Sequence, residues 1–145
     1  MSWVRVYIHM VFSTKNREPF LSSSDLRKKV FQHIKKNAAE KDIWLDCVNG
    51  YQEHAHCFIS LGKEQSISKV AQLIKGESSF WINQNKLTPD KFFWQDDYWA
   101  VGISESHIEP VRKYIHNQEE HHSKKSFTEE VDGFMEKYGW HLIKQ

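Results

Sequence analysis

Residues 3–13, WVRVYIHMVFS, restrict the fold more than any other stretch of this chain. The segment is dense in Val, Ile, Tyr and Phe, which are residue types that strands favour. A strand with one face in water alternates apolar and polar side chains, but this segment leaves few polar gaps. The pattern therefore predicts a central strand that is buried on both faces.

The segments that follow alternate between helical and strand-like patterns. Residues 22–25 offer several capping side chains for a helix over about 25–41, where apolar residues recur at helical spacing. Residues 43–49 and 54–61 are strand-like, and Asn49-Gly50 is a turn signal between them. The remaining expected elements are strand-like segments at 92–94 and 98–103 and helices at 66–83, 110–122 and 127–138.

This order of elements, β-α-β-β-α-β-α-α, predicts an α+β fold with a mainly antiparallel sheet and helices packed on it. The first six elements match the split βαβ, ferredoxin-like order. The length of 145 residues fits one continuous core. We expect residues 1–122 to form a single domain, with residues 123–145 as a C-terminal helical extension of it.

The sequence also predicts a cytoplasmic location. No stretch approaches the roughly 20 apolar residues that a membrane-spanning helix needs, and the N-terminus lacks the features of a secretory signal. Cys47 and Cys57 form no CxxC pair and no disulfide framework. We interpret both thiols as small core residues in a reducing compartment.

The distribution of charge leaves room for a nucleic acid partner. The whole chain has a formal net charge of only +1, yet residues 1–41 carry nine Lys or Arg against three Asp or Glu. A basic half can supply phosphate contacts while the chain stays near neutral. A solvated helix face explains part of this charge equally well.

His54-Ala55-His56 is the first group of residues that could carry chemistry. Residues i and i+2 of a strand point to the same face, so both imidazoles would project together while Ala55 points into the opposite layer. Two neutral imidazoles are a sound start for a divalent metal site, but a third ligand must come from elsewhere. Surface or packing histidines give the same pattern.

Tyr114 and Gln118 form the second group. On a helix, positions i and i+4 stack on one face, so a phenol and an amide would lie one turn apart. A metal ion bound to a phosphate would help the phenol to attack it, and Gln118 offers a carbonyl oxygen as the missing hard ligand. An amphipathic helix with Tyr114 in the core is the alternative.

Taken together, these two groups are more specific than either alone. The chain resembles the single-tyrosine HUH transposases, the small enzymes of the insertion-sequence 200/605 group and their REP-associated relatives. His54-Ala55-His56 corresponds to the HUH strand, and Tyr114 to Gln118 to the Tyr-Ile-x-x-Gln helix. Further matching segments cover about residues 3–122, so this part would be the catalytic domain. Ala55 departs from the family only in size, because the middle residue is usually bulky.

The resemblance implies a mechanism and partners for this chain. His54, His56 and Gln118 would hold one divalent ion, Mg²⁺ or Mn²⁺, at a scissile phosphate. Tyr114 would attack that phosphate of single-stranded DNA, leaving a 5′-phosphotyrosine and a free 3′-hydroxyl. The DNA would contain hairpins at the ends of an element, and the protein would act as a homodimer. Lys15, Arg17 and Lys75 are candidates for phosphate contacts.

Two alternatives stay open at this point. A split βαβ sheet can bind nucleic acid without cutting it, in which case the histidine pair is incidental. A metal-dependent hydrolase would use the helix residues from His116 to His122, but His116 and His121 are five apart and zinc helices space their histidines by four. His121 and His122 are better interpreted as a solvated helix end.

Overall fold

The chain forms a four-stranded antiparallel sheet in the order β2-β3-β1-β4, in a computed structural model that describes residues 1–122 and 124–138. The strands are β1 (Val6–Ser13), β2 (Trp44–Tyr51), β3 (His54–Leu61) and β4 (Trp99–Ile103). β1 pairs with β3 on one side and with β4 on the other, which confirms the prediction of a central strand.

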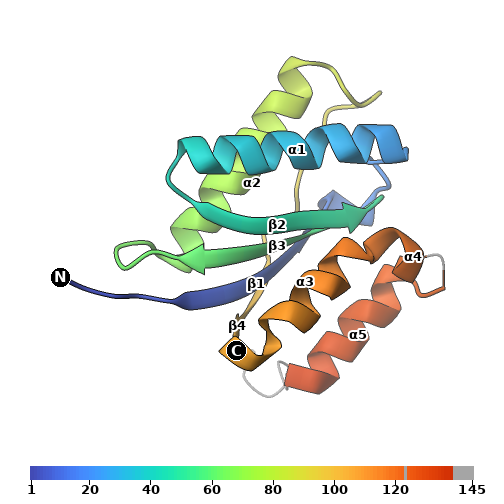
Figure 1. The fold of residues 1–145 in the computed structure, drawn as a ribbon. Coiled ribbons are helices and arrows are strands. Elements are labelled where there is room, and N and C mark those ends of the chain that lie inside the picture. Colours follow the sequence, from blue (N-terminus) through green and yellow to red (C-terminus); the bar gives the residue numbers. More distant parts are fainter. Residues whose placement is uncertain (123, 139–145) are drawn as a thin grey trace.

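Helices cover both faces of this sheet (Figure 1). One face carries α1 (Ser24–Glu40) and α2 (Ile67–Gln84), and the other carries α3 (Ile108–His116), α4 (Gln118–His122) and α5 (Phe127–Tyr138). Two short 3-10 turns complete the chain, η1 (Lys15–Arg17) after β1 and η2 (Glu105–His107) before α3. This arrangement confirms the predicted α+β class.

The two long helices begin where their capping serines lie. The Oγ of Ser23 accepts a hydrogen bond from the backbone N–H of Leu26 at 3.1 Å, and the Oγ of Ser66 accepts one from Lys69 at 3.1 Å. Each serine thereby satisfies one of the N–H groups that have no partner within a helix. Ser23 is thus the cap among the candidates at residues 22–25.

Alternation along the central strands creates two separate interiors. Met10 and Phe12 of β1 face α1 and α2 within the larger apolar cluster, together with Ala55 and Cys57 of β3. Side chains one position out of phase face α3 and α5 instead and form smaller clusters. Both cysteines are free and buried, as predicted.

The predicted start of the first strand is wrong. β1 begins at Val6, and Trp3 is 86% exposed. The strand begins no earlier because Val6 pairs with Leu61, the last residue of β3. The residues before Val6 therefore have no partner in β3. The segment at 92–94 is not a regular strand either, since only Trp94 makes an isolated bridge, to Thr14.

The last helix spans Phe127–Tyr138, as the sequence predicts. Ser123 and residues 139–145 of the predicted C-terminal extension lie outside the described residues. The division into a domain at 1–122 and an extension stays a prediction. No helix in the described part of the chain combines the length and apolar character needed to cross a membrane.

Candidate metal and tyrosine site

The imidazoles of His54 and His56 lie on the face of the sheet that carries α3 and α5. Both side chains are fully buried, and their ring centroids lie 5.0 Å apart. Ala55, between them, packs in the cluster on the opposite face. Both imidazoles therefore project from the same face of the sheet, as the alternation of a strand predicted.

The hairpin between β2 and β3 fixes the position of His54. The turn lies at Gln52 and Glu53. The turn predicted at Asn49-Gly50 is therefore wrong, because Asn49 and Gly50 belong to β2. A Cβ at Gly50 would lie 2.1 Å from the carbonyl oxygen of His54, so only glycine fits there. The Nδ1 of His54 pairs with the Glu53 carboxylate at 2.7 Å, which orients its Nε2 toward the site.

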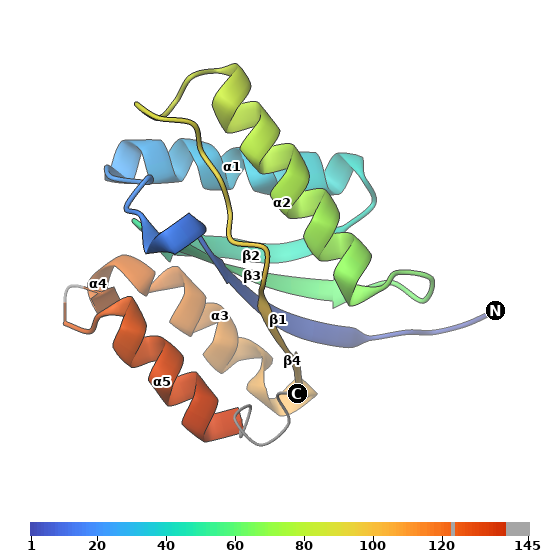
Figure 2. The same cartoon turned by 180° about the vertical axis from the view of Figure 1, so that it is seen from behind.

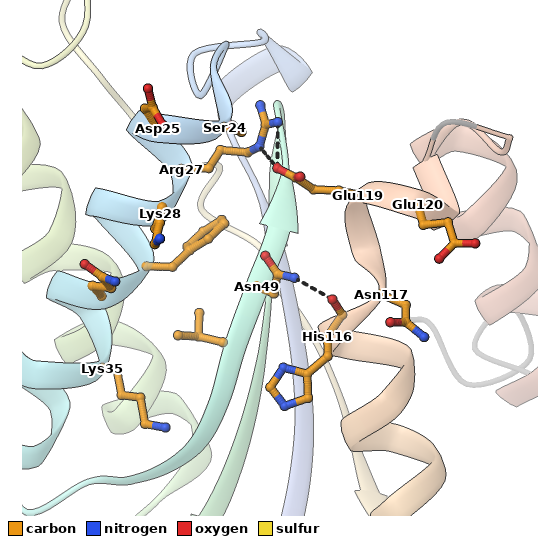
Figure 3. Close-up of a pocket in the computed structure, with 13 residues that line it drawn as sticks. Ser24, Asp25, Arg27, Lys28, Lys35, Asn49, His116, Asn117, Glu119 and Glu120 are labelled. Atoms are coloured by element: carbon orange, nitrogen blue, oxygen red, sulfur yellow. Dashed lines mark hydrogen bonds and ion pairs between the residues drawn. The ribbon is translucent and has the colours of Figure 1, made fainter.

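Gln118 joins His54 from the other side of the site. Its Oε1 lies 3.0 Å from the Nε2 of His54, and the residue is fully buried. The predicted helix at 110–122 is interrupted at Asn117, so Gln118 begins α4 rather than continuing α3. The Nδ2 of Asn49 donates to the carbonyl oxygen of His116 (Figure 3) and to that of Ile115, which stabilises the C-terminal end of α3.

Tyr114 of α3 completes the predicted set within the same chain. Its ring centroid lies 5.6 Å from that of His56, and the residue is half-buried. The hydroxyl donates a hydrogen bond to the carboxylate of Glu130 and lies 3.5 Å from the Nε2 of His121. The structure thus brings Tyr114, His54, His56 and Gln118 together.

His9 of β1 belongs to the site although the sequence analysis did not include it. Its Nε2 lies 2.8 Å from the Nδ1 of His56, and it is buried. Burial, reinforced by the neighbouring His56, lowers the pKa of His9 to about 3, and burial lowers the pKa of His56 to about 4. Both rings are therefore neutral at neutral pH, which is the form that can ligate a cation.

Two further residues belong to the site: Glu130, which the sequence analysis missed, and His122, which it assigned to a solvated helix end. The side chains of both are 1% exposed, so the interpretation of His122 as part of a solvated helix end is wrong. Together with His54 they form a group whose ligand atoms lie within 4.8 Å of one another and could hold a metal ion. The available signal was the position of Glu130, since Phe127, Glu130 and Val131 share one helix face at i, i+3 and i+4.

The three residues predicted to contact DNA lie outside this cluster. Arg17 is nearest, because its Nη1 donates to the Oγ1 of Thr128 in α5. Lys15 is exposed beside the ring of Phe93. Lys75 lies on α2, across the sheet, where its ammonium donates to the carbonyl oxygen of Asp96 at 2.8 Å.

A groove of about 690 Å³ runs between α1, β2 and the α3–α4 corner (Figure 3). Arg27 and Glu119 form a 2.8 Å ion pair across it, which joins α1 to α4. Its lining residues include Lys28, Lys35 and Asn49, but none of the histidines or the tyrosine of the site. The predicted site residues lie instead in the closed interior between β3, α3 and α5.

Comparisons with known proteins point in one direction. A model of the IS200-like transposases matches residues 2–118, whereas no curated protein sequence matches significantly. A candidate transposase from Deinococcus radiodurans R1 has a TM-score of 0.62 at 18% identity, over 81% of this chain and 93% of that one. A REP-associated tyrosine transposase bound to a REP hairpin has a TM-score of 0.58 at 15% identity, over 88% and 73%. At these identities the two structures show a shared fold.

Proposed function

The chain belongs to the IS200-like transposase family, and from this premise we propose that it cuts and rejoins single-stranded DNA through a covalent bond to Tyr114. Membership of the family makes it a DNA-processing transposase. The tyrosine mechanism, the metal ligands and the form of the DNA are the proposed parts. One observation carries them: a phenol, two imidazoles and an amide oxygen, from β3 and the α3–α4 corner, meet in one chain.

The residues present fit a divalent cation. His54 and His56 offer ring nitrogens, and Gln118 offers an amide oxygen 3.0 Å from the nearer ring. Glu53 and His9 hold the other nitrogen of each ring, as partners of metal-ligating histidines do. A bound ion would neutralise charge that develops on a scissile phosphate. The mixed nitrogen and oxygen donors suit Mn²⁺ as well as Mg²⁺.

Tyr114 supplies the nucleophile in this proposal. Its phenolic oxygen gives up its proton and forms a bond to phosphorus while the bond from phosphorus to the 3′-oxygen breaks, and the leaving 3′-oxygen takes up a proton to become a free hydroxyl. The product is a 5′-phosphotyrosine, which keeps the energy of the phosphodiester. A second 3′-hydroxyl can then reverse the step and join new ends, so no ATP is needed.

Binding of the DNA is proposed from charge and from the fold. The exposed Lys15 and Arg17 follow β1, and Arg17 reaches α5 through Thr128, so both can contact a phosphate backbone. Lys75 would need to leave its backbone partners to do the same. A structural neighbour has a REP hairpin bound, which supports a hairpin-containing single strand as substrate.

We also propose a homodimer that acts in the cytoplasm. Tyr114 lies beside His56 of its own chain, so a dimer would not be required to complete this arrangement. Light scattering after size-exclusion chromatography measures the assembly directly. A purely monomeric protein at working concentrations would remove the dimer from the proposal without affecting the chemistry.

The decisive experiment looks for the covalent intermediate. Labelled single-stranded DNA from the flanks of the gene is incubated with protein and Mn²⁺ or Mg²⁺, then resolved under denaturing conditions. We expect a labelled protein band that disappears in Tyr114→Phe and persists in Tyr98→Phe, since Tyr98 packs at the opposite core. His56→Ala is expected to lose cleavage while keeping its circular dichroism spectrum. A Tyr114→Phe protein that still forms the adduct would refute the assignment, and tight binding without any adduct would favour a binding module.

A further inference from the structure

Helix α5 places a carboxylate among the imidazoles of the site. α5 lies beside α3 in both views (Figures 1 and 2). The Oε1 of Glu130 is 3.1 Å from the Nε2 of His56 and 3.4 Å from that of His54. Its Oε2 is 3.3 Å from the Nε2 of His121 and 3.3 Å from that of His122. The matched family region ends at residue 118, so this carboxylate comes from a part of the chain beyond it.

A buried carboxylate here calls for a positive partner. Burying an unpaired charge costs several kcal/mol, and helices that only cover a sheet use apolar residues on that face. The ion pairs of Glu130 among the described residues are all with histidines. Histidines that ligate a metal are neutral, so a cation held between them and Glu130 would balance this charge.

The spacing of the donor atoms matches a coordination shell. A first-row divalent ion with ligands at about 2.1 Å holds neighbouring donors roughly 3.0–3.4 Å apart. Among His54, His56, Gln118 and Glu130, three donor pairs fall in this range: His54 with Gln118 at 3.0 Å, His56 with Glu130 at 3.1 Å and His54 with Glu130 at 3.4 Å. In addition, the buried Nε2 of His122 lies 3.3 Å from the Oε2 of Glu130 and is a further donor atom at the site.

The same carboxylate closes the site to DNA. His54, His56 and Gln118 have no exposed surface while α5 is docked. The hydroxyl of Tyr114, the proposed nucleophile, donates to Glu130. An anionic oxygen thus lies between the imidazoles and the phenol, where the proposed reaction needs an oxygen of the scissile phosphate.

We propose that Glu130 ligates the catalytic ion when α5 is docked, and that the scissile phosphate must displace it before Tyr114 can react. This inference rests on the proposed function for its second half only. Arg17 links the docked and the released state of α5, because it contacts this helix when it is docked. Its guanidinium donates to Thr128 and lies 5.1 Å from the centre of the Phe127 ring. A DNA phosphate that binds Arg17 would remove this support and favour release of α5.

Two measurements on the intact chain test the proposal. Calorimetric titration of DNA-free protein with Mn²⁺ gives the metal affinity, and the rate of the covalent band gives the chemistry at saturating Mn²⁺. We expect Glu130→Gln to weaken Mn²⁺ binding by about tenfold or more and to speed adduct formation. Glu136→Gln, an exposed change on the same helix, is the matched control and should equal the parent protein.

The possible outcomes test the assignment of Glu130 as a metal ligand separately from the proposed function. Unchanged Mn²⁺ affinity in folded Glu130→Gln overturns the ligand assignment, and slower adduct formation overturns the displacement by phosphate. Lost Mn²⁺ affinity with no adduct in any variant supports the ligand and refutes the proposed function instead. If Glu130→Gln does not fold, Phe127→Ala loosens α5 from its anchor and must give the same two changes for the proposal to stand.

Discussion

Replacing Phe127 by alanine should release α5 without unfolding the sheet. Phe127 is 4% exposed and clusters with Val11, Val131 and Trp99. Its ring also stacks on His54, with centroids 4.1 Å apart and an interplanar angle of 9°. Truncation of a buried Phe to Ala costs about 3–5 kcal/mol, and we expect the lower end because this cluster is small.

The size of the effect follows from that energy. A loss of about 3 kcal/mol in the docking of α5 raises the open fraction by roughly two orders of magnitude, at about 1.4 kcal/mol per factor of ten. Backbone amides of a helix exchange with solvent through such local openings. Amide hydrogen exchange in α5 should therefore accelerate about 100-fold, while exchange in β3 stays nearly constant.

Peptide-resolved hydrogen exchange with mass spectrometry measures both segments in one experiment. Phe80→Ala is the control, because Phe80 is 66% exposed on α2 and its truncation removes little buried surface. Equal acceleration of α5 and β3 in Phe127→Ala would mean that α5 opens only with the whole fold. That result would refute the separate docking on which the displacement of Glu130 by DNA depends.

Three further substitutions test the site and the contacts that hold its strands and helices in place. The hydrogen bonds from Arg112 hold the pKa of Asp46 below its usual value, so this pair stabilises the fold above about pH 4 and loses its effect as pH falls further. Thermal melts of Asp46→Asn should differ from those of the parent protein at pH 7, and the difference should shrink as the pH falls below about 4. His9→Ala should weaken Mn²⁺ binding about tenfold or more by calorimetry, because the Nδ1 of His56 loses its partner. Gly50→Ala should lower the free energy of unfolding by about 1–3 kcal/mol in denaturant titrations, since its Cβ would lie 2.1 Å from a carbonyl oxygen of β3.

Two of these predictions have matched control substitutions. Gly76→Ala is the control for Gly50, because a Cβ there meets nothing within 4 Å and alanine favours the helix. His107→Ala replaces an exposed histidine before α3 and should leave Mn²⁺ affinity unchanged. A pH-independent difference for Asp46→Asn would contradict the charged nature of its pairing with Arg112.

Local patterns were enough to predict most elements of the fold. The strand at His54–Leu61 and the helix at Phe127–Tyr138 have the predicted bounds, because residue periodicity and turn residues act within a few positions. The break at Asn117 could not be predicted in this way. It depends on Asn49, a residue 66 positions away from the carbonyl of Ile115 that its side chain binds.

Local sequence was sufficient to identify the candidate reactive side chains. Strand alternation makes His54 and His56 neighbours. A separation of four positions keeps Gln118 beside Tyr114 even though the helix is interrupted at Asn117, because the Nε2 of Gln118 lies 3.4 Å from the carbonyl oxygen of Tyr114. The residues that surround these side chains depend on how the chain folds. His9 reaches His56 across 47 residues and Glu130 reaches it across 74, because β1 pairs with β3 and α5 packs against the same face. Such contacts depend on chain topology and burial, which no local pattern encodes.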